Sequence, residues 1–188
     1  MSDQQFLKSY LEDLSDLLKP SDVIINELIQ VRDLLLEVNK NNNKTLIFGN
    51  GGSASIASHF SVDLTKNAGL CCVNYNEADL ITCFANDYGF ERWVGKSVDF
   101  YGDEGDLLIV ISSSGNSENM LNGVKAAQIG KFRAVVTFSG FDEHNPLRQL
   151  GDINLWVNSR AYNFVENIHQ IWLLAIVDLI IGDREYSA

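Results

Sequence analysis

Residues 107–117 read LLIVISSSGNS, an apolar run that ends in a loop rich in hydroxyl groups. The apolar part, Leu107–Ile111, has the length and composition of a buried strand. The residues that follow return to helical spacing and stop at Gly130, which predicts a helix over 117–129. A strand, a polar loop and a helix in this order are typical of one unit of a parallel α/β sheet.

Four further apolar runs alternate with helical segments around this stretch. The alternation indicates an α/β protein in which helices cover both faces of a parallel sheet. Right-handed crossovers then give a three-layer, doubly wound fold with five strands. We expect strands at 45–48, 70–75, 107–111, 133–138 and 153–157, and helices near 53–67, 78–101 (broken), 117–129 and 162–181.

The first 43 residues show helical periodicity and no strand pattern. Apolar residues recur at helical spacing over 5–18, and again over 24–38 after an interruption at Pro20. We therefore expect one domain over residues 1–188, with a helical arm at 1–43 and an α/β core at 44–188.

The chain is acidic, with 14 Lys and Arg against 25 Asp and Glu and a formal net charge of −11. This charge disfavours nucleic acid and anionic membranes as partners, although a helix N-terminus can still bind a small anion. Three cysteines without disulfide or zinc spacing, and a start without a signal-peptide pattern, predict a cytoplasmic protein. The apolar stretch 168–181 contains polar residues and indicates a buried helix rather than a membrane span.

A glycine-rich loop, GNGGSA at 49–54, follows the strand predicted at 45–48. Its glycines permit a tight turn and a close approach of a ligand to the main chain, at the start of a helix. The spacing also fits a dinucleotide-binding turn, and a tight turn without a ligand is the simplest alternative. The candidate substrate-binding residues of this loop are Asn50, Gly51, Gly52 and Ser53.

The second loop, 112–117, lies where the strand 107–111 gives way to a helix. Serine hydroxyls and main-chain N–H groups can surround a phosphate dianion without Lys or Arg. A serine-rich helix cap is the alternative, but a cap needs only one serine. Ligands of doubly wound folds bind at the carboxyl ends of strands, which favours a phosphate site. Its hydroxyls come from Ser112, Ser113, Ser114 and Ser117.

The loop 111–117 resembles the phosphate-binding signature of the sugar isomerase (SIS) domain family. Residues 48–54 with His59, and residues 86–90 (NDYGF), are similar to its phosphoheptose isomerase branch. The resemblance covers nearly the whole chain. It implies a five-stranded parallel sheet and a homotetramer with active sites between subunits. It also implies that the four serines hold the sugar phosphate, and that Asn50, Ser53 and Asp87 contact the sugar hydroxyls.

The activity that this resemblance implies is isomerisation of sedoheptulose 7-phosphate to D-glycero-D-manno-heptose 7-phosphate, a precursor of lipopolysaccharide and other surface polysaccharides. Aldose–ketose isomerisation moves a proton between adjacent carbons through an enediol or enediolate, so it needs a base and an acid. His59 and Asp63 lie four apart on one predicted helix, and Glu166 and His169 lie three apart on another. Such pairs on facing helices can bind a divalent metal or transfer protons. One consistent assignment makes Glu166 the base and His59 or His169 the acid.

The resemblance also implies a zinc site, built in the phosphoheptose isomerase branch from a His and a Glu on the first helix and a Gln and a His on the last. His59 matches the first His, whereas Asp63 stands in place of the Glu and Glu166 in place of the Gln. The second His position falls on Leu174, which has no ligating atom. Zinc on His59, Asp63 and Glu166 is therefore a hypothesis, and no nucleotide cofactor is expected.

Each candidate also has a structural alternative. His169 can be a hydrogen-bonded core residue, Asp63 can pair with Lys66, and Glu166 can belong to an interface ion pair. Two other functions stay open. One is a non-catalytic regulator that binds a phosphosugar or the replication initiator DnaA, which Leu174 and Asn163 favour. The other is a dinucleotide-binding oxidoreductase. The oxidoreductase is the weaker alternative, because the chain leaves little room for a substrate domain.

Overall fold

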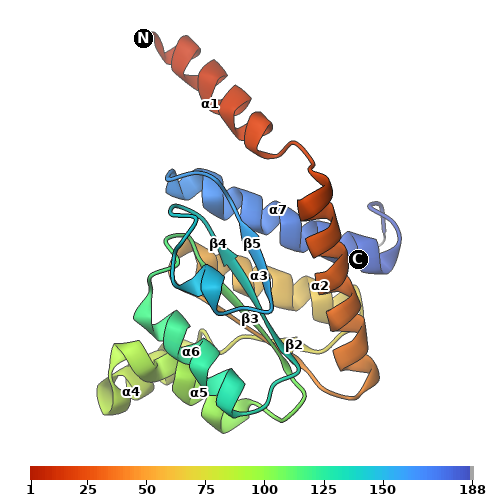
Figure 1. Cartoon of the computed structure of the whole chain (residues 1–188), viewed down its shortest axis with the longest axis vertical. Helices are drawn as coiled ribbons and strands as arrows, with labels where there is room; N and C mark the ends of the chain where they lie inside the picture. The colour runs from red at the N-terminus through yellow and green to blue at the C-terminus, as the bar shows by residue number, and fades with distance from the viewer. Residues whose placement is uncertain (187–188) are drawn as a thin grey trace.

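A five-stranded parallel sheet lies at the centre of the computed structural model, which describes residues 1–186 (Figure 1). Its neighbouring strands follow the order β2-β1-β3-β4-β5, and every pair is parallel. The predicted doubly wound α/β fold is thereby confirmed. The strands are β1 (Thr45–Gly49), β2 (Cys72–Val73), β3 (Leu107–Ser112), β4 (Ala134–Ser139) and β5 (Ile153–Trp156).

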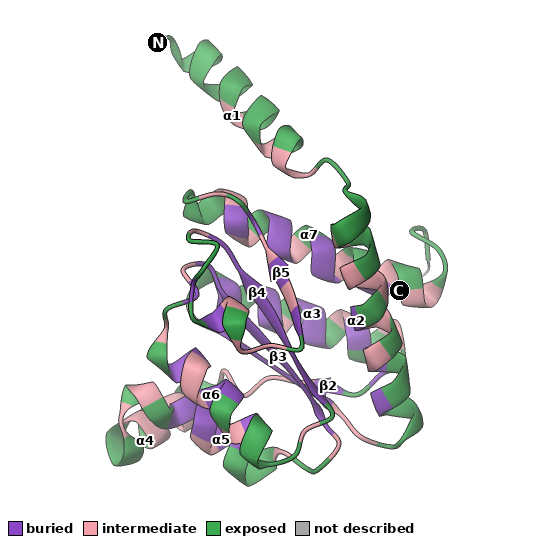
Figure 2. Cartoon of the chain, in the orientation of Figure 1, coloured by how far each residue is buried: buried purple, intermediate pink, exposed green. Residues whose placement is uncertain are grey.

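The strand sequences explain the two cores of the domain. β1, β3 and β4 are buried along their whole length, as expected for parallel strands that helices cover on both faces (Figure 2). Because side chains alternate between the faces of a strand, Ile47 and Ile109 belong to one core cluster and Leu46 and Leu108 to the other. Apolar residues therefore stabilise the sheet from both sides.

Three helices pack on each face of the sheet (Figure 1). The long helix predicted over 78–101 is broken, as expected, at Gly89, whose φ of +92° favours glycine, and at a short 3₁₀ turn. One face carries α2 (Asp22–Lys40), α3 (Gly52–Lys66) and α7 (Tyr162–Ile181), and the other carries α4 (Ala78–Tyr88), α5 (Trp93–Tyr101) and α6 (Glu118–Ile129).

α7 is long and apolar enough, by length and composition alone, to cross a membrane. In the structure, however, Val165, Ile168 and Leu173 pack into the core together with side chains of α2 and α3. This packing agrees with the buried helix expected from the sequence.

α1 (Asp3–Leu17) projects away from the rest of the domain (Figures 1 and 2). Ser2 caps its N-terminus through a capping box with Gln5. No residue of α1 is buried, and Phe6 and Leu11 are more than half exposed. Of the helical arm expected over 1–43, only α1 projects, whereas α2 packs on the core. α1 leaves apolar side chains uncovered within the described chain.

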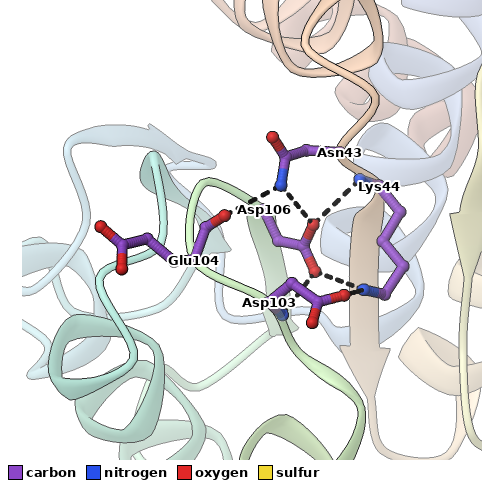
Figure 3. A network of polar contacts seen from close by, with 5 residues as sticks. All are labelled: Asn43, Lys44, Asp103, Glu104 and Asp106. Carbon is purple, nitrogen blue, oxygen red and sulfur yellow. Dashed lines mark hydrogen bonds and ion pairs between the residues drawn. The ribbon is translucent and has the colours of Figure 1, made fainter.

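A partly buried ion pair joins the amino ends of β1 and β3, at the end of the sheet opposite the two loops (Figure 3). The buried Asp106 carboxylate lies 2.7 Å from Lys44 Nζ and accepts a hydrogen bond from the Lys44 main-chain N–H at 3.0 Å. Asp103 lies 2.6 Å from the same Nζ. Burial lowers the pKa of Lys44, but hydrogen bonds to the two carboxylates outweigh it and raise the pKa overall. The charged pair therefore helps to fix the register of these strands.

Candidate functional site

The carboxyl ends of β1 and β3 border a cavity of about 220 Å³. β2 lies on one side of β1 and β3 lies on the other. The order in which successive strands are added to the sheet therefore reverses at this point. Doubly wound folds bind ligands at such a switch point. The cavity is lined by both predicted loops and by the start of α7, through Asn50, Ser53, Ile111, Ser112, Ser113, Ser114, Ser117, Tyr162 and Glu166.

The serine loop, residues 112–117, leaves hydrogen-bonding groups without partners. Ser117 occupies the N-cap position of α6, yet its side chain makes no capping hydrogen bond and instead lies 3.2 Å from the Ser112 hydroxyl. Ser113 Oγ is buried and has no hydrogen-bond partner among residues 1–186. Buried hydroxyls nearly always have one. The loop therefore does not act as a simple serine cap, and its free groups suit an anionic ligand.

Asn145 supports the serine loop from behind. Its side-chain amide donates hydrogen bonds to Ser139 Oγ at 3.1 Å and to the Asp142 carbonyl at 2.7 Å. Gly115 adopts a φ of +67°, and a Cβ at that position would overlap the Asn145 side chain. Asn145 was not predicted from the sequence, because only its burial in the fold distinguishes it from a polar loop residue.

The glycine loop places Asn50 against α6. The Asn50 and Asn119 side chains exchange two hydrogen bonds, at 3.0 and 2.9 Å, across the junction of the two loops. Gly51 has a φ of +55°, which explains the glycine at the turn. Of the four residues predicted in this loop, Asn50 and Ser53 line the cavity, whereas Gly51 and Gly52 do not. Asn119, like Asn145, was missed.

Glu166 brings a carboxylate to the cavity wall. It lies against Gly52, where a Cβ would overlap the carboxylate. Within residues 1–186 no hydrogen bond or ion pair holds this side chain, so the interface ion pair considered above has no partner in the described chain. Burial raises the pKa of Glu166. A carboxylate with a raised pKa is better suited to accept a proton near neutral pH.

His59 and Asp63 form a pair further along α3, outside the cavity lining. His59 Nε2 lies 3.2 Å from Asp63 Oδ2, and His59 Nδ1 lies 3.1 Å from Gln170 Nε2 on α7. Asp63 also accepts a hydrogen bond from Asn67 at 3.2 Å, rather than pairing with a lysine. The sequence offered one signal for Gln170: it lies one helical turn after Glu166.

Zinc on His59, Asp63 and Glu166 stays a hypothesis. Within residues 1–186, no three His, Cys, Asp or Glu side chains are placed to share a metal ion. Glu166 therefore does not join His59 and Asp63 in one metal site. Leu174 supplies no ligand one turn beyond Gln170.

His169 and Asp87, two further candidates, do not line the cavity. His169 is fully buried, with Nε2 3.1 Å from the Ser139 carbonyl oxygen, and burial lowers its pKa to about 4. The structure thus places His169 as the hydrogen-bonded core residue considered above, away from any ligand in the cavity. Asp87 is exposed on α4 and accepts a hydrogen bond from Asn86 at 2.9 Å.

Comparison with known proteins agrees with this fold. A family model for the SIS domain matches residues 9–136. The phosphoheptose isomerases of Aliarcobacter butzleri and Helicobacter pylori (strain P12) are 32% and 33% identical over 187 residues, which cover 96% of this chain and 97% and 91% of theirs. The phosphoheptose isomerase structure from Neisseria gonorrhoeae has a TM-score of 0.87 at 28% identity, covering 96% of this chain and 100% of that one. The chain therefore belongs to the SIS domain family, in its phosphoheptose isomerase branch.

Proposed function

We propose that this protein is an aldose–ketose isomerase that converts sedoheptulose 7-phosphate to D-glycero-D-manno-heptose 7-phosphate, for surface polysaccharide precursors. One observation carries the proposal: the serine loop and the Glu166 carboxylate line the same cavity. Within residues 1–186, neither Ser113 Oγ nor that carboxylate has a hydrogen-bond partner. A phosphate site and a base within one cavity are what a phosphosugar isomerase requires. The similar proteins named phosphoheptose isomerase support the choice of sugar.

The phosphate end of the substrate would lie in the serine loop. The hydroxyls of Ser112, Ser113, Ser114 and Ser117 can donate hydrogen bonds to its oxygens, and the first N–H groups of α6 point to the same place. The positive end of the α6 dipole adds a favourable interaction with the dianion. Asn50 and Ser53, on the opposite wall, would then contact the sugar hydroxyls.

Glu166 would act as the base. Its carboxylate removes the proton from the carbon next to the carbonyl, which produces an enediolate, and the resulting carboxylic acid returns a proton to the adjacent carbon. A second group must move a proton between the two oxygens. His59 is the remaining candidate, because His169 is enclosed in the core on the Ser139 carbonyl.

We further propose a cytoplasmic homotetramer with sites between subunits. The uncovered apolar side chains of α1, such as Phe6 and Leu11, support burial against another copy of the chain. Asp87 lies outside the cavity of its own chain, so it could contact a sugar only from a neighbouring subunit. The free cysteines Cys71, Cys72 and Cys83 are consistent with a reducing compartment.

The test is to incubate the purified protein with sedoheptulose 7-phosphate and to follow formation of the aldose by NMR. We expect turnover, and we expect Glu166→Gln to reduce it by about two orders of magnitude or more while phosphosugar binding persists. Binding of sedoheptulose 7-phosphate in a thermal-shift assay without turnover would instead favour a non-catalytic regulator, the alternative suggested by Leu174. If the protein showed no binding and no turnover, the phosphosugar site itself would be overturned.

A further inference from the structure

The segment that follows β4, residues 140–148, lies against the serine loop and holds two of its carbonyl groups. The Gly140 main-chain N–H donates to the Ser113 carbonyl at 2.9 Å, and the Leu147 main-chain N–H donates to the Gly115 carbonyl at 3.0 Å. No residue of this segment lines the cavity. The segment therefore contacts the loop from the side away from the cavity.

These two contacts decide which polar groups of the loop are left for a ligand. In a trans peptide unit the C=O and N–H bonds point in opposite directions. Because the Ser113 carbonyl points to Gly140, the N–H of Ser114 in the same peptide unit points away from the segment, and Ser114 itself lines the cavity. A carbonyl oxygen turned toward a phosphate would repel it, whereas an N–H group attracts it. The hydrogen bonds from the segment thus give the loop the polarity that an anion requires.

One buried side chain, that of Asn145, holds the segment in this shape. Its amide nitrogen donates to the carbonyls of Gly140, at 3.3 Å, and Asp142, at 2.7 Å, and its amide oxygen accepts from the Arg148 main-chain N–H at 3.0 Å. A main-chain carbonyl only accepts and a main-chain N–H only donates, so these partners fix the orientation of the amide. Asn145 is 2% exposed, so water cannot replace the bonds that it makes.

Asn145 also contacts the serine loop directly. Gly115 lies so close to Asn145 Oδ1 that a Cβ would overlap this oxygen, and its φ of +67° favours glycine. The same oxygen accepts the hydrogen bond from Arg148, which keeps it in place. A side chain that does not line the cavity therefore sets the position of the turn in the serine loop.

We propose that Asn145 is a positioning residue of the phosphate site. It holds segment 140–148 against the serine loop, so that the loop presents N–H and hydroxyl groups, and not carbonyls, to an anion. The loop is then arranged for binding before the ligand arrives, in agreement with the buried Ser113 Oγ, which has no hydrogen-bond partner within residues 1–186. This inference rests on the phosphate site of the proposed function, but not on the isomerase reaction.

The first test removes the hydrogen-bond donor of Asn145 and keeps the shape of the side chain. In Asn145→Asp the side chain still accepts from Arg148, but it no longer donates to the carbonyls of Gly140 and Asp142. We expect the dissociation constant of the full chain for inorganic phosphate, measured by calorimetry, to rise about 10-fold or more, the effect of losing one hydrogen bond to a charged group. Unchanged phosphate affinity in Asn145→Asp would overturn the inference.

Asn154→Asp is the matched control, because it removes the same kind of hydrogen bond outside the serine loop and segment 140–148. Asn154 Nδ2 donates to the Gly151 carbonyl at 2.7 Å, and Asn154 Oδ1 accepts from Thr137 Oγ1 at 2.6 Å. We expect both variants to lower the midpoint of urea unfolding, and only Asn145→Asp to weaken phosphate binding. An equal loss of affinity in the two variants would show that Asn145 only stabilises the fold, which contradicts the proposal.

The second test approaches the same contact from the loop, and it decides the question if Asn145→Asp does not fold. Gly115→Ala brings a methyl group onto Asn145 Oδ1, and we expect phosphate binding to weaken by about 10-fold here too. Gly105→Ala is its control, because Gly105 has a φ of +91° and lies against Asn43 at the opposite end of the sheet. The control should lose stability and keep its phosphate affinity. Full affinity in Gly115→Ala would contradict the proposal.

Turnover of sedoheptulose 7-phosphate separates this inference from the proposed function. We expect Asn145→Asp to raise KM with little change in kcat, because the lost interaction holds the phosphate equally in the substrate and in the transition state. If the unmodified protein binds phosphate through Asn145 but turns over no sugar, the proposed reaction fails and the inference stands. If Asn145→Asp turns over the sugar with unchanged KM, the inference fails and the proposed function stands.

Discussion

The Glu166 carboxylate packs against Gly52, the first residue of α3, leaving no space for a Cβ at that position. The third glycine of the GNGGSA loop thus makes room for a side chain from α7, and not for a ligand at the main chain. This contact links the glycine loop directly to the proposed base.

Gly52→Ala should therefore separate activity from stability. The added methyl group must displace the carboxylate, and a displacement of about 1 Å at a reacting group can cost roughly 100-fold in rate. Alanine is the better helix former, so the midpoint of thermal unfolding should stay the same or rise. Steady-state kinetics and thermal unfolding measure both effects. Gly51→Ala is the matched control. A Cβ at this position would meet no atom within 4 Å, but Gly51 has a φ of +55°, so alanine there should lower stability. Full kcat in Gly52→Ala would contradict this role of the glycine.

Ser113→Ala should affect the empty and the liganded protein in opposite ways. Its buried hydroxyl has no hydrogen-bond partner in the described part of the chain, so its removal should leave the free energy of unfolding unchanged or raise it. Loss of a hydrogen bond to a charged phosphate should weaken binding of the sugar phosphate by roughly 10- to 100-fold. Ser139→Ala is the control, because that buried hydroxyl accepts a hydrogen bond from Asn145 and its loss should destabilise the empty protein. Equal affinity in Ser113→Ala would show that the phosphate lies elsewhere.

The pH dependence of kcat should report Glu166. Burial raises the pKa of this carboxyl, and the base must be ionised to remove a proton. The rate should therefore fall as the pH decreases. This fall should occur at a higher pH than the protonation of an exposed glutamate. We choose kcat because the substrate phosphate itself ionises near pH 6 and influences binding. Glu166→Gln should lack this acid limb, and its persistence in that variant would assign it to another group.

His169 should make the stability of the protein depend on pH in mildly acidic solution. Burial lowers its pKa from 6.5 in the unfolded chain to about 4 in the fold, so the unfolded state binds more protons between these values. Stability is then complete above pH 6.5 and falls as the pH drops toward 4, by roughly 3 kcal/mol at about 1.4 kcal/mol per pH unit. Urea unfolding at several pH values measures this slope. His169→Gln should reduce the slope, whereas the exposed His144→Gln should not, and equal slopes in all three proteins would contradict the assignment.

Periodicity was sufficient to predict the regular elements but not their edges. The helix at 162–181 was predicted with its observed bounds, whereas the strand expected over 70–75 is reduced to Cys72–Val73. The physical reason is visible at Cys72, whose main-chain N–H donates to Thr65 Oγ1 at 3.0 Å and whose carbonyl accepts from it at 3.1 Å. A side chain of α3 thus satisfies the outer edge of β2, which no local pattern of residues 70–75 reveals.

Some residues of the candidate site could be predicted from the sequence and others could not. Residues in the two loops that follow β1 and β3 were predictable, because the composition of each loop and its position after a strand are both visible in the local sequence. Asn119, Asn145 and Gln170 were not, since each is defined by a partner on another element. His169 was misleading for the same reason: its spacing from Glu166 suggested shared chemistry, but their side chains point to different surroundings, the cavity and the core.

The absence of basic side chains from the cavity lining has a consequence for how a ligand arrives. The nine residues that line it include no Lys or Arg, and the chain as a whole carries a net charge of −11. A doubly negative sugar phosphate is therefore repelled at long range and attracted only at contact, so added salt should accelerate its association by screening that repulsion. Selection then takes place at close quarters, through the fit of hydroxyls and amides around the anion, and larger polyanions in the same solution are kept at a distance.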